Sequence, residues 1–170
     1  MLRKTDIAYL LFFTTHIPII YLIDTAPLQP SWAISPLSTT LREFYVNTYR
    51  DKFFDSPAPP WFTTFIWMEV LYHVPASLWA VWGLLKEHPL IPVHLLVFGI
   101  QAFITSLTCL VEVWAWEDRS VAEKQNITAL YGPYVALGAY MAIDSILRLR
   151  AKLMPANQAQ TQTRTQVKQE

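Results

Sequence analysis

Charged residues are scarce in this sequence: they make up 15% of the 170 residues, while hydrophobic residues make up 53%. That balance argues against an ordinary water-soluble domain, so lipid is the expected solvent. The 13 Lys and Arg residues are scattered along the chain and balance the 13 Asp and Glu residues. Because no basic face exists to follow a phosphate backbone, nucleic acid is not an expected partner.

Cysteine is almost absent, since Cys109 is the single one. One cysteine excludes an intrachain disulfide and any multi-cysteine metal site. We therefore expect neither a bound metal nor a cofactor.

Four apolar runs are long enough to form helices that cross a bilayer, which takes roughly 17 to 25 mainly apolar residues. They cover residues 7–23, 61–85, 90–116 and 129–147. Only four residues separate the second run from the third, so these two form an antiparallel hairpin. The sequence therefore predicts an all-α protein, a four-helix transmembrane bundle.

The segments outside these runs differ in character. Residues 41–54 alternate aromatic and charged side chains, which predicts an amphipathic helix lying along the membrane surface. The tail 155–170 is rich in Gln and Thr and is expected to be disordered, because it buries too little to offset its ordering entropy. We divide the chain into an N-terminal segment 1–6, a transmembrane domain 7–150 and a disordered tail 151–170.

Basic residues flank the apolar runs unevenly. They precede the first run, occupy the loop between the second and third, and follow the fourth: Arg3, Lys4, Lys86, Arg148, Arg150 and Lys152. By the positive-inside rule both termini are expected in the cytosol. The first run could also be a cleaved signal peptide, but its length and Asp24 before any cleavage position favour an uncleaved anchor.

Four carboxyl groups fall within or at the ends of these runs: Asp24, Glu69, Glu112 and Asp144. A charge at membrane depth costs about 2.5 to 3.5 kcal/mol, so each must be neutralised, partnered or reached by water. No Lys or Arg lies inside a run, so none of these acids has an obvious basic partner in the chain. Two neighbouring carboxyls that keep one negative charge would attract the ammonium of an amphipathic amine.

Other polar residues lie at helical spacing from these acids. Glu69 and His73 are four residues apart, on one helix face, and can share a proton. Thr105, Thr108 and Glu112 form a polar stripe that is expected to face inward. His16 lies two turns before Asp24.

Each of these residues also has an interpretation without a ligand. Asp24 can mark the interface or cap a turn. Glu112 and Asp144 lie near the ends of their runs and can extend to water. His73 can be a neutral core histidine bonded to a carbonyl.

Short motifs on all four runs occur in an order known from one family. They are His16-Ile17-Pro18-Ile19 followed by Asp24, Pro59-Pro60-Trp61-Phe62 followed by Glu69 and Pro75, Glu117-Asp118, and Tyr131-Gly132-Pro133-Tyr134. Together they resemble the EXPERA family, and within it the sigma-2 receptor branch. The resemblance covers roughly residues 7–150.

This resemblance implies a homodimeric, multi-pass protein of the endoplasmic reticulum membrane that takes up sterol-like or amine ligands from the bilayer. In that branch the acid matching Asp24 pairs with the ligand's amine, and the acid matching Glu69 is its buried neighbour. Tyr134 matches a pocket tyrosine, and Thr105 or Thr108 a pocket threonine. The branch is also linked to protein targeting between the endoplasmic reticulum and mitochondria, so a role in sterol or protein trafficking is expected.

The same family includes the emopamil-binding protein, a sterol Δ8-Δ7 isomerase, which gives a second possible function. Glu69, His73 and Glu112 could act as its acid, base and cation-stabilising groups. However, that enzyme has its histidine one turn before the glutamate, whereas His73 follows Glu69. A third interpretation is a scaffold whose buried acids specify helix packing. We expect ligand binding rather than catalysis, with a site of His16, Asp24, Glu69, His73, Thr105, Thr108 and Tyr134.

Overall fold

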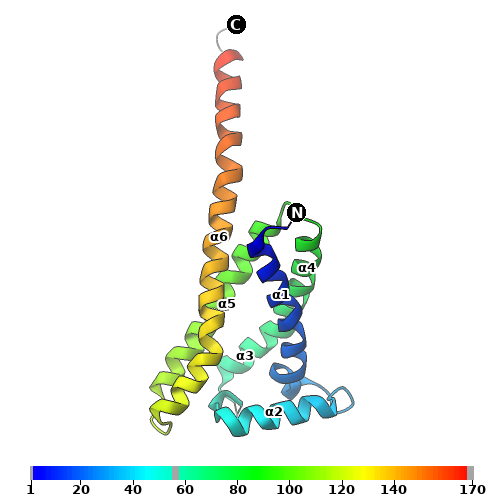
Figure 1. Ribbon diagram of the computed structural model, residues 1–170, viewed down its shortest axis with the longest axis vertical. Helices are drawn as coiled ribbons and strands as arrows, with labels where there is room; N and C mark the ends of the chain where they lie inside the picture. The colour runs from blue at the N-terminus through cyan, green and yellow to red at the C-terminus, as the bar shows by residue number, and fades with distance from the viewer. Residues whose placement is uncertain (1, 55–57, 168–170) are drawn as a thin grey trace.

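The computed structural model describes residues 2–54 and 58–167, and within them every regular element is a helix (Figure 1). The prediction of an all-α fold is confirmed. In chain order the elements are α1 (Lys4–Ile19), a π-turn (Ile20–Asp24), a 3₁₀ turn (Ala26–Leu28), α2 (Pro36–Tyr49), a 3₁₀ turn (Lys52–Phe54), α3 (Pro60–Met68), a second π-turn (Glu69–His73), α4 (Val74–Leu85), α5 (Ile91–Ala115) and α6 (Val121–Val167).

The four predicted spans correspond to four long helical rods. One π-turn, Ile20–Asp24, extends α1, and the other, Glu69–His73, joins α3 to α4. When each rod is counted as one helix and α2 is added, the described residues form five helices rather than four. Two rods, Lys4–Asp24 and Ile91–Ala115, are on their own long and apolar enough to cross a membrane. The predicted N-terminal segment 1–6 is partly helical, since α1 begins at Lys4.

Helix α2 fulfils the prediction of a helix in the first loop, but it begins five residues earlier than expected. Ser35 caps it by accepting a hydrogen bond from the Ser38 backbone N–H, and Pro36 occupies the first helical position. Both are typical start signals, and they precede the aromatic residues on which the prediction was based. The helix ends at Tyr49, and the next residue, Arg50, adopts a left-handed conformation with φ 53°.

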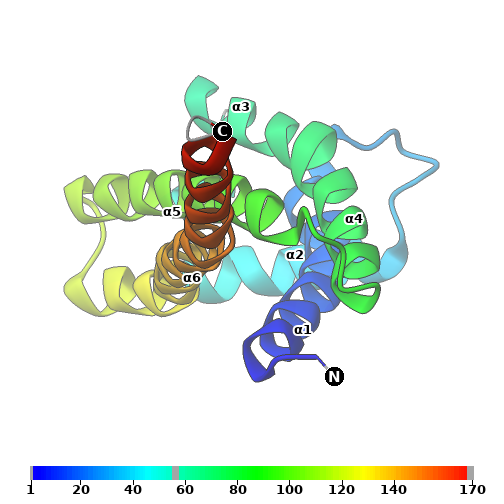
Figure 2. The same cartoon turned by 90° about the horizontal axis from the view of Figure 1, so that it is seen from above.

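The arrangement of the rods places the chain's N-terminus and the extension of α6 at one end of the bundle (Figure 1). Helix α2 lies across the opposite end, roughly perpendicular to the rods. Viewed along the bundle, α5 and α6 run side by side while α1, α3 and α4 lie to one side of them (Figure 2).

Helices α5 and α6 approach each other closely at a pair of glycines. A Cβ atom added to Gly99 would lie 2.8 Å from the carbonyl oxygen of Gly138, and one added to Gly138 would lie 2.8 Å from that of Gly99. Small residues allow such backbone contact between helices in a bilayer. This contact fixes α5 against α6, and the two helices together form one wall of the bundle.

Two apolar clusters pack the interior. The cluster near the N-terminal end joins α1, α4, α5 and α6 around Tyr9, Phe13, Leu84, Leu95, Phe98 and Met141. The cluster near α2 joins the first loop and α3 to α5 and α6 around Phe53, Phe62, Ile66, Val113, Trp116 and Ile127.

Helix α6 continues to Val167 and extends away from the bundle (Figure 1), and the disorder expected of the tail stays a prediction. A helix satisfies its backbone hydrogen bonds within its own segment, and Ala, Gln, Lys and Met have favourable helix propensities. Residues 168–170 lie outside the described residues.

Candidate functional site

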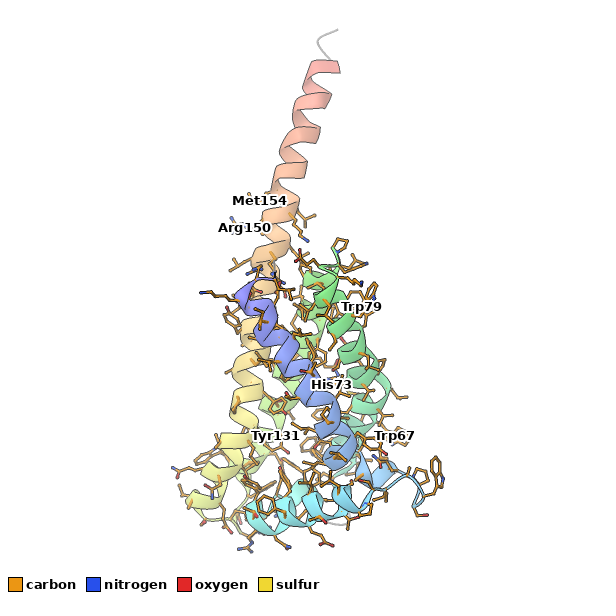
Figure 3. The ribbon with its side chains drawn as sticks, turned by 45° about the vertical axis from the view of Figure 1, so that its right-hand side comes forward. Trp67, His73, Trp79, Tyr131, Arg150 and Met154 are labelled. Carbon is orange, nitrogen blue, oxygen red and sulfur yellow. The ribbon has the colours of Figure 1, made fainter. Side chains whose placement is uncertain are left out.

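A cavity of about 380 Å³ lies between the rods and α2, within the size range of roughly 300 to 1,000 Å³ typical of small-molecule pockets. Its lining is mostly apolar and aromatic. The aromatic side chains come from α1, α2, the loop after α2, α3 and α6: Phe12, Phe44, Tyr45, Tyr49, Phe54, Phe62, Phe65, Tyr131 and Tyr134. Figure 3 places His73 midway along the bundle and Tyr131 nearer to α2. Such a surface can cover the apolar body of a small ligand.

Both predicted ligand acids lie on π-turns. Asp24 ends the first one, where the backbone N–H and the hydroxyl of Thr25 both donate to the carbonyl oxygen of Ile20, at 3.0 and 2.9 Å. Glu69 begins the second, where the Val74 N–H donates to the Glu69 carbonyl oxygen. Pro75 follows directly, and because proline lacks an N–H it disfavours regular α-helical bonding there. Such π-turns occur often at functional sites, and here they position an acid on the cavity wall.

The two carboxyl groups lie close enough to interact electrostatically, and both line the cavity. The Oε2 atom of Glu69 is buried and has no hydrogen-bond partner in the part of the chain that the structure describes. A buried carboxyl with an unused oxygen points to a partner that does not belong to the chain.

Asp24 has a basic neighbour that the sequence did not indicate. Arg42 of α2 interacts electrostatically with Asp24, and its Nη1 donates to the carbonyl oxygen of Ile23 at 3.4 Å. Its guanidinium lies 5.0 Å from the centre of the Phe54 ring. Burial lowers the pKa of Arg42, and the charge of Asp24 opposes that shift. Arg42 comes close to Asp24 because α2 folds back across the end of the bundle.

The two predicted histidines meet inside the cavity. His16 and His73 are 5% and 6% exposed, and their ring centres are 5.9 Å apart. His16 Nδ1 and both ring nitrogens of His73 lack a hydrogen-bond partner within the described residues. The structure thus does not provide the carbonyl partner considered for His73. Over the same residues, no three His, Cys, Asp or Glu side chains are grouped to hold a metal.

The remaining predicted residues divide between the cavity and its surroundings. Thr105 and Tyr134 line it. Thr108 is exposed outside the lining, and its hydroxyl donates to the carbonyl oxygen of Ile104 at 2.8 Å. Glu112 also lies outside the lining, because it is two turns beyond Thr105 toward the end of α5.

Asp51 is a buried acid that sequence reasoning missed. It is 0% exposed, and its carboxylate accepts hydrogen bonds from the hydroxyls of Tyr45 and Tyr131, at 2.7 and 3.1 Å, and from the Phe53 N–H at 2.9 Å. Burial and the charge of Asp51 raise the pKa of Tyr45. Both tyrosines line the cavity, so Asp51 fixes its wall. Between Arg50 and Lys52 in the sequence, it resembled an ordinary solvated loop residue.

Asp144 has partners at the N-terminal end of the bundle. Arg3 lies 2.9 Å and Arg148 3.3 Å from its carboxylate, and the Tyr9 hydroxyl donates to it at 3.2 Å. Arg148 also forms an ion pair with Asp6. The expectation that Asp144 has no basic partner was wrong, because both arginines lie just outside the apolar runs and reach back to it.

Comparison with known proteins agrees with this architecture. Residues 37–145 match the model of the EXPERA (EXPanded EBP superfamily) family. The chain is 32% identical over 143 residues to the "Efficient mitochondria targeting-associated protein 19" of Schizosaccharomyces pombe, covering 82% of this chain and 73% of that protein. The chain belongs to the EXPERA family. The resemblance inferred from the motifs is therefore confirmed.

A second group of EXPERA relatives carries the name of a receptor. The chain is 23% identical over 140 residues to the "Sigma intracellular receptor 2" of Homo sapiens, covering 75% of this chain and 78% of that protein. The protein of the same name from Xenopus tropicalis is 27% identical over 73 residues, 43% of this chain and 42% of its own. EXPERA proteins are helical membrane proteins, so this chain is one as well.

Proposed function

We propose that this protein is a multi-pass protein of the endoplasmic reticulum membrane that binds sterol-like or cationic amphiphilic ligands in its cavity. The observation that carries the proposal is the Asp24 and Glu69 pair on the wall of an aromatic cavity, with the Glu69 Oε2 atom unpartnered among the described residues. The surroundings of Asp144 and Asp51 differ, because several side chains donate to each of those acids.

The chemistry of this pair suits an amine with an apolar body. An ammonium group carries a positive charge and only donates hydrogen bonds, and a carboxyl pair can accept those bonds. Aromatic faces such as those of Phe12, Tyr45 and Tyr134 favour a nearby cation and cover apolar surface. Asp24 accordingly pairs with the amine, and Glu69 stabilises that geometry from the neighbouring helix.

The cellular role we propose is sterol or protein trafficking. The name of the fission yeast relative refers to targeting to mitochondria, and that of the human relative to an intracellular receptor. A cavity that binds sterols could couple membrane composition to such a process. In this proposal the protein has four membrane spans and acts as a homodimer, and both termini, which extend from one end of the bundle, lie in the cytosol.

Equilibrium binding of a radiolabelled hydrophobic amine to detergent-purified protein tests the proposal. Wild type is compared with Asp24→Asn and Glu69→Gln, and thermal unfolding checks that each variant is folded. Saturable binding that is lost in both folded variants supports the acid pair. A folded wild type that does not bind the amine contradicts the proposal.

Sterol Δ8-Δ7 isomerisation is the second candidate, because Glu69 and His73 line one cavity and carry unpartnered atoms within the described residues. Two features count against it. His73 follows Glu69 instead of preceding it, and Glu112, the third expected catalytic group, lies outside the lining. Incubation of the protein with a Δ8-sterol decides the matter, since formation of the Δ7 product that Glu69→Gln abolishes would establish catalysis.

A further inference from the structure

The residues that line the cavity include polar atoms that the carboxyl pair does not use. His16 Nδ1, both ring nitrogens of His73 and Gln101 Nε2 are buried without a hydrogen-bond partner among the described residues. All three side chains line the cavity. Buried polar groups in proteins are nearly always hydrogen-bonded, so four such atoms together point to a partner from outside the chain.

These side chains come from three elements and are held by aromatic packing. His16 lies on α1, His73 on the second π-turn and Gln101 on α5. The His16 ring stacks on Phe12 at 5.0 Å, and the His73 ring packs on Phe98 at 4.8 Å. Ring packing holds both imidazoles, so a ligand group that bonds to their nitrogens displaces no bond to the protein.

The donor and acceptor pattern selects the ligand group. The Gln101 amide nitrogen only donates, whereas a neutral imidazole offers one donor and one acceptor. A hydroxyl both donates and accepts, so it matches the amide and an imidazole in either tautomer. An ammonium only donates and leaves the Gln101 amide unmatched. A carboxylate or phosphate would lie within one helical turn of Glu69, which would repel it.

We propose that His16, His73 and Gln101 form a hydroxyl subsite, which binds the hydroxyl group of a neutral sterol. The aromatic lining covers the sterol body, and Asp24 and Glu69 serve the amine group of cationic ligands. One cavity therefore recognises two ligand classes through different polar groups. This inference rests on the proposed function, because it names the ligand class of the same cavity.

The test compares two sterols that differ only in the hydroxyl. Full-length protein in lipid nanodiscs is titrated with cholesterol and with 5-cholestene, which carries hydrogen in place of the hydroxyl. We expect wild type to bind cholesterol about tenfold more tightly, since leaving buried hydrogen-bonding groups unpaired weakens binding by at least that order. His73→Phe and Gln101→Leu each reduce this ratio, because the replaced side chain can no longer bond to the hydroxyl.

Two further variants make the comparison specific. His88→Phe is the matched control, because His88 lies in the turn between α4 and α5 and outside the cavity lining, and it keeps the wild-type ratio. His73→Gln retains a hydrogen-bonding side chain and therefore keeps part of the preference. Thermal unfolding confirms that each variant is folded. If His73→Phe does not fold, Gln101→Leu tests the subsite.

The result that overturns the subsite is equal binding of the two sterols by wild type, or a preference that persists in both folded variants. Binding of the radiolabelled amine to the same preparation separates this failure from that of the proposed function. Saturable amine binding without a sterol preference overturns the hydroxyl subsite alone. Absence of amine binding by folded wild type overturns the proposed function too.

Discussion

Asp144 and Glu69 are both acids on helices of one bundle, but their surroundings differ. Asp144 accepts hydrogen bonds from Arg3 and Tyr9 and lies 3.3 Å from Arg148. Glu69 lies on a π-turn beside a cavity and has an oxygen atom without a partner in the described residues. The two acids therefore differ in their partners: the partners of Asp144 belong to the fold, whereas Glu69 has an oxygen atom left for a ligand.

The position along the bundle explains why the two acids differ. Arg3 and Arg148 lie at helix ends, where long basic side chains stay close to water and can still reach Asp144. Glu69 lies midway along the rod that joins α3 to α4, where a basic residue would itself be costly to bury. A ligand amine can supply the missing charge there.

The largest effect on stability is expected from removing the shared arginine. Arg148→Met leaves the carboxyls of Asp6 and Asp144, both mostly buried, without their common partner. Breaking such a pair typically destabilises a protein by about 3 kcal/mol. Chemical unfolding in detergent measures the loss, with Arg150→Met, on the exposed side of α6, as the control. Equal stability of the two variants would contradict a structural role for the cluster.

Replacing Glu69, the acid assigned to the ligand, should stabilise the protein, whereas replacing Arg148 should destabilise it. Glu69→Leu removes a carboxyl that is costly to bury and has an unpartnered oxygen among the described residues, so the free energy of unfolding should rise by about 1 to 2 kcal/mol. Glu69→Gln, which keeps the shape, separates the effect of charge from that of packing. A loss of stability in both variants would place Glu69 with Asp144 among the structural acids.

A third acid sharpens the comparison because it lies beside the cavity and yet is fully bonded. Asp51→Asn leaves one oxygen to accept from the Tyr45 and Tyr131 hydroxyls and the Phe53 N–H, because the amide nitrogen only donates. We expect a loss of about 1 to 2 kcal/mol in stability. Amine binding should weaken as well, because both tyrosines line the cavity. Unchanged stability would show that Asp51 does not support the wall.

The smallest effect concerns exposed acids at the turn between α5 and α6. The hydrogen bond from Lys52 lowers the pKa of Asp118, and hydrogen bonds from Ser120 lower that of Glu123. The folded state therefore binds protons less readily than the unfolded state, and this stabilisation is present above the ordinary pKa values. It is lost as the pH falls below about 4, through the lowered values.

Melting temperature measured between neutral and acidic pH tests this linkage. Wild type should lose stability on acidification slightly more than Lys52→Met, in which Asp118 keeps a more ordinary pKa. Added salt should reduce the difference, since these groups are exposed and screened. An identical pH profile for the two proteins would show that the pair contributes nothing.

Much of the fold could be predicted from local features. Apolar runs of sufficient length gave the four rods, and the alternation after residue 40 indicated α2. The predicted start of α2 came too late in the sequence, because the prediction did not include the start signals Ser35 and Pro36. The motifs around Asp24 and Glu69 identified the family, and both acids line the cavity.

The rest depends on contacts between distant residues, which the sequence does not encode in a local pattern. Asp144 meets Arg3 across 141 residues, and Asp51 meets Tyr131 across 80. Spacing along α5 placed Thr105 and Thr108 on one polar stripe, but Thr108 is exposed and only Thr105 lines the cavity. Gln101 carried no signal, because an amide on an apolar helix becomes informative only when its neighbours are known.

The most direct test of this division of acids measures stability and amine binding on the same two variants, Glu69→Gln and Asp144→Asn. We expect Glu69→Gln to melt at or above the wild-type temperature and to lose saturable amine binding. We expect Asp144→Asn to melt at a lower temperature but to bind the amine with wild-type affinity while folded, if this division is right. Retained binding in Glu69→Gln, or lost binding in folded Asp144→Asn, would contradict it.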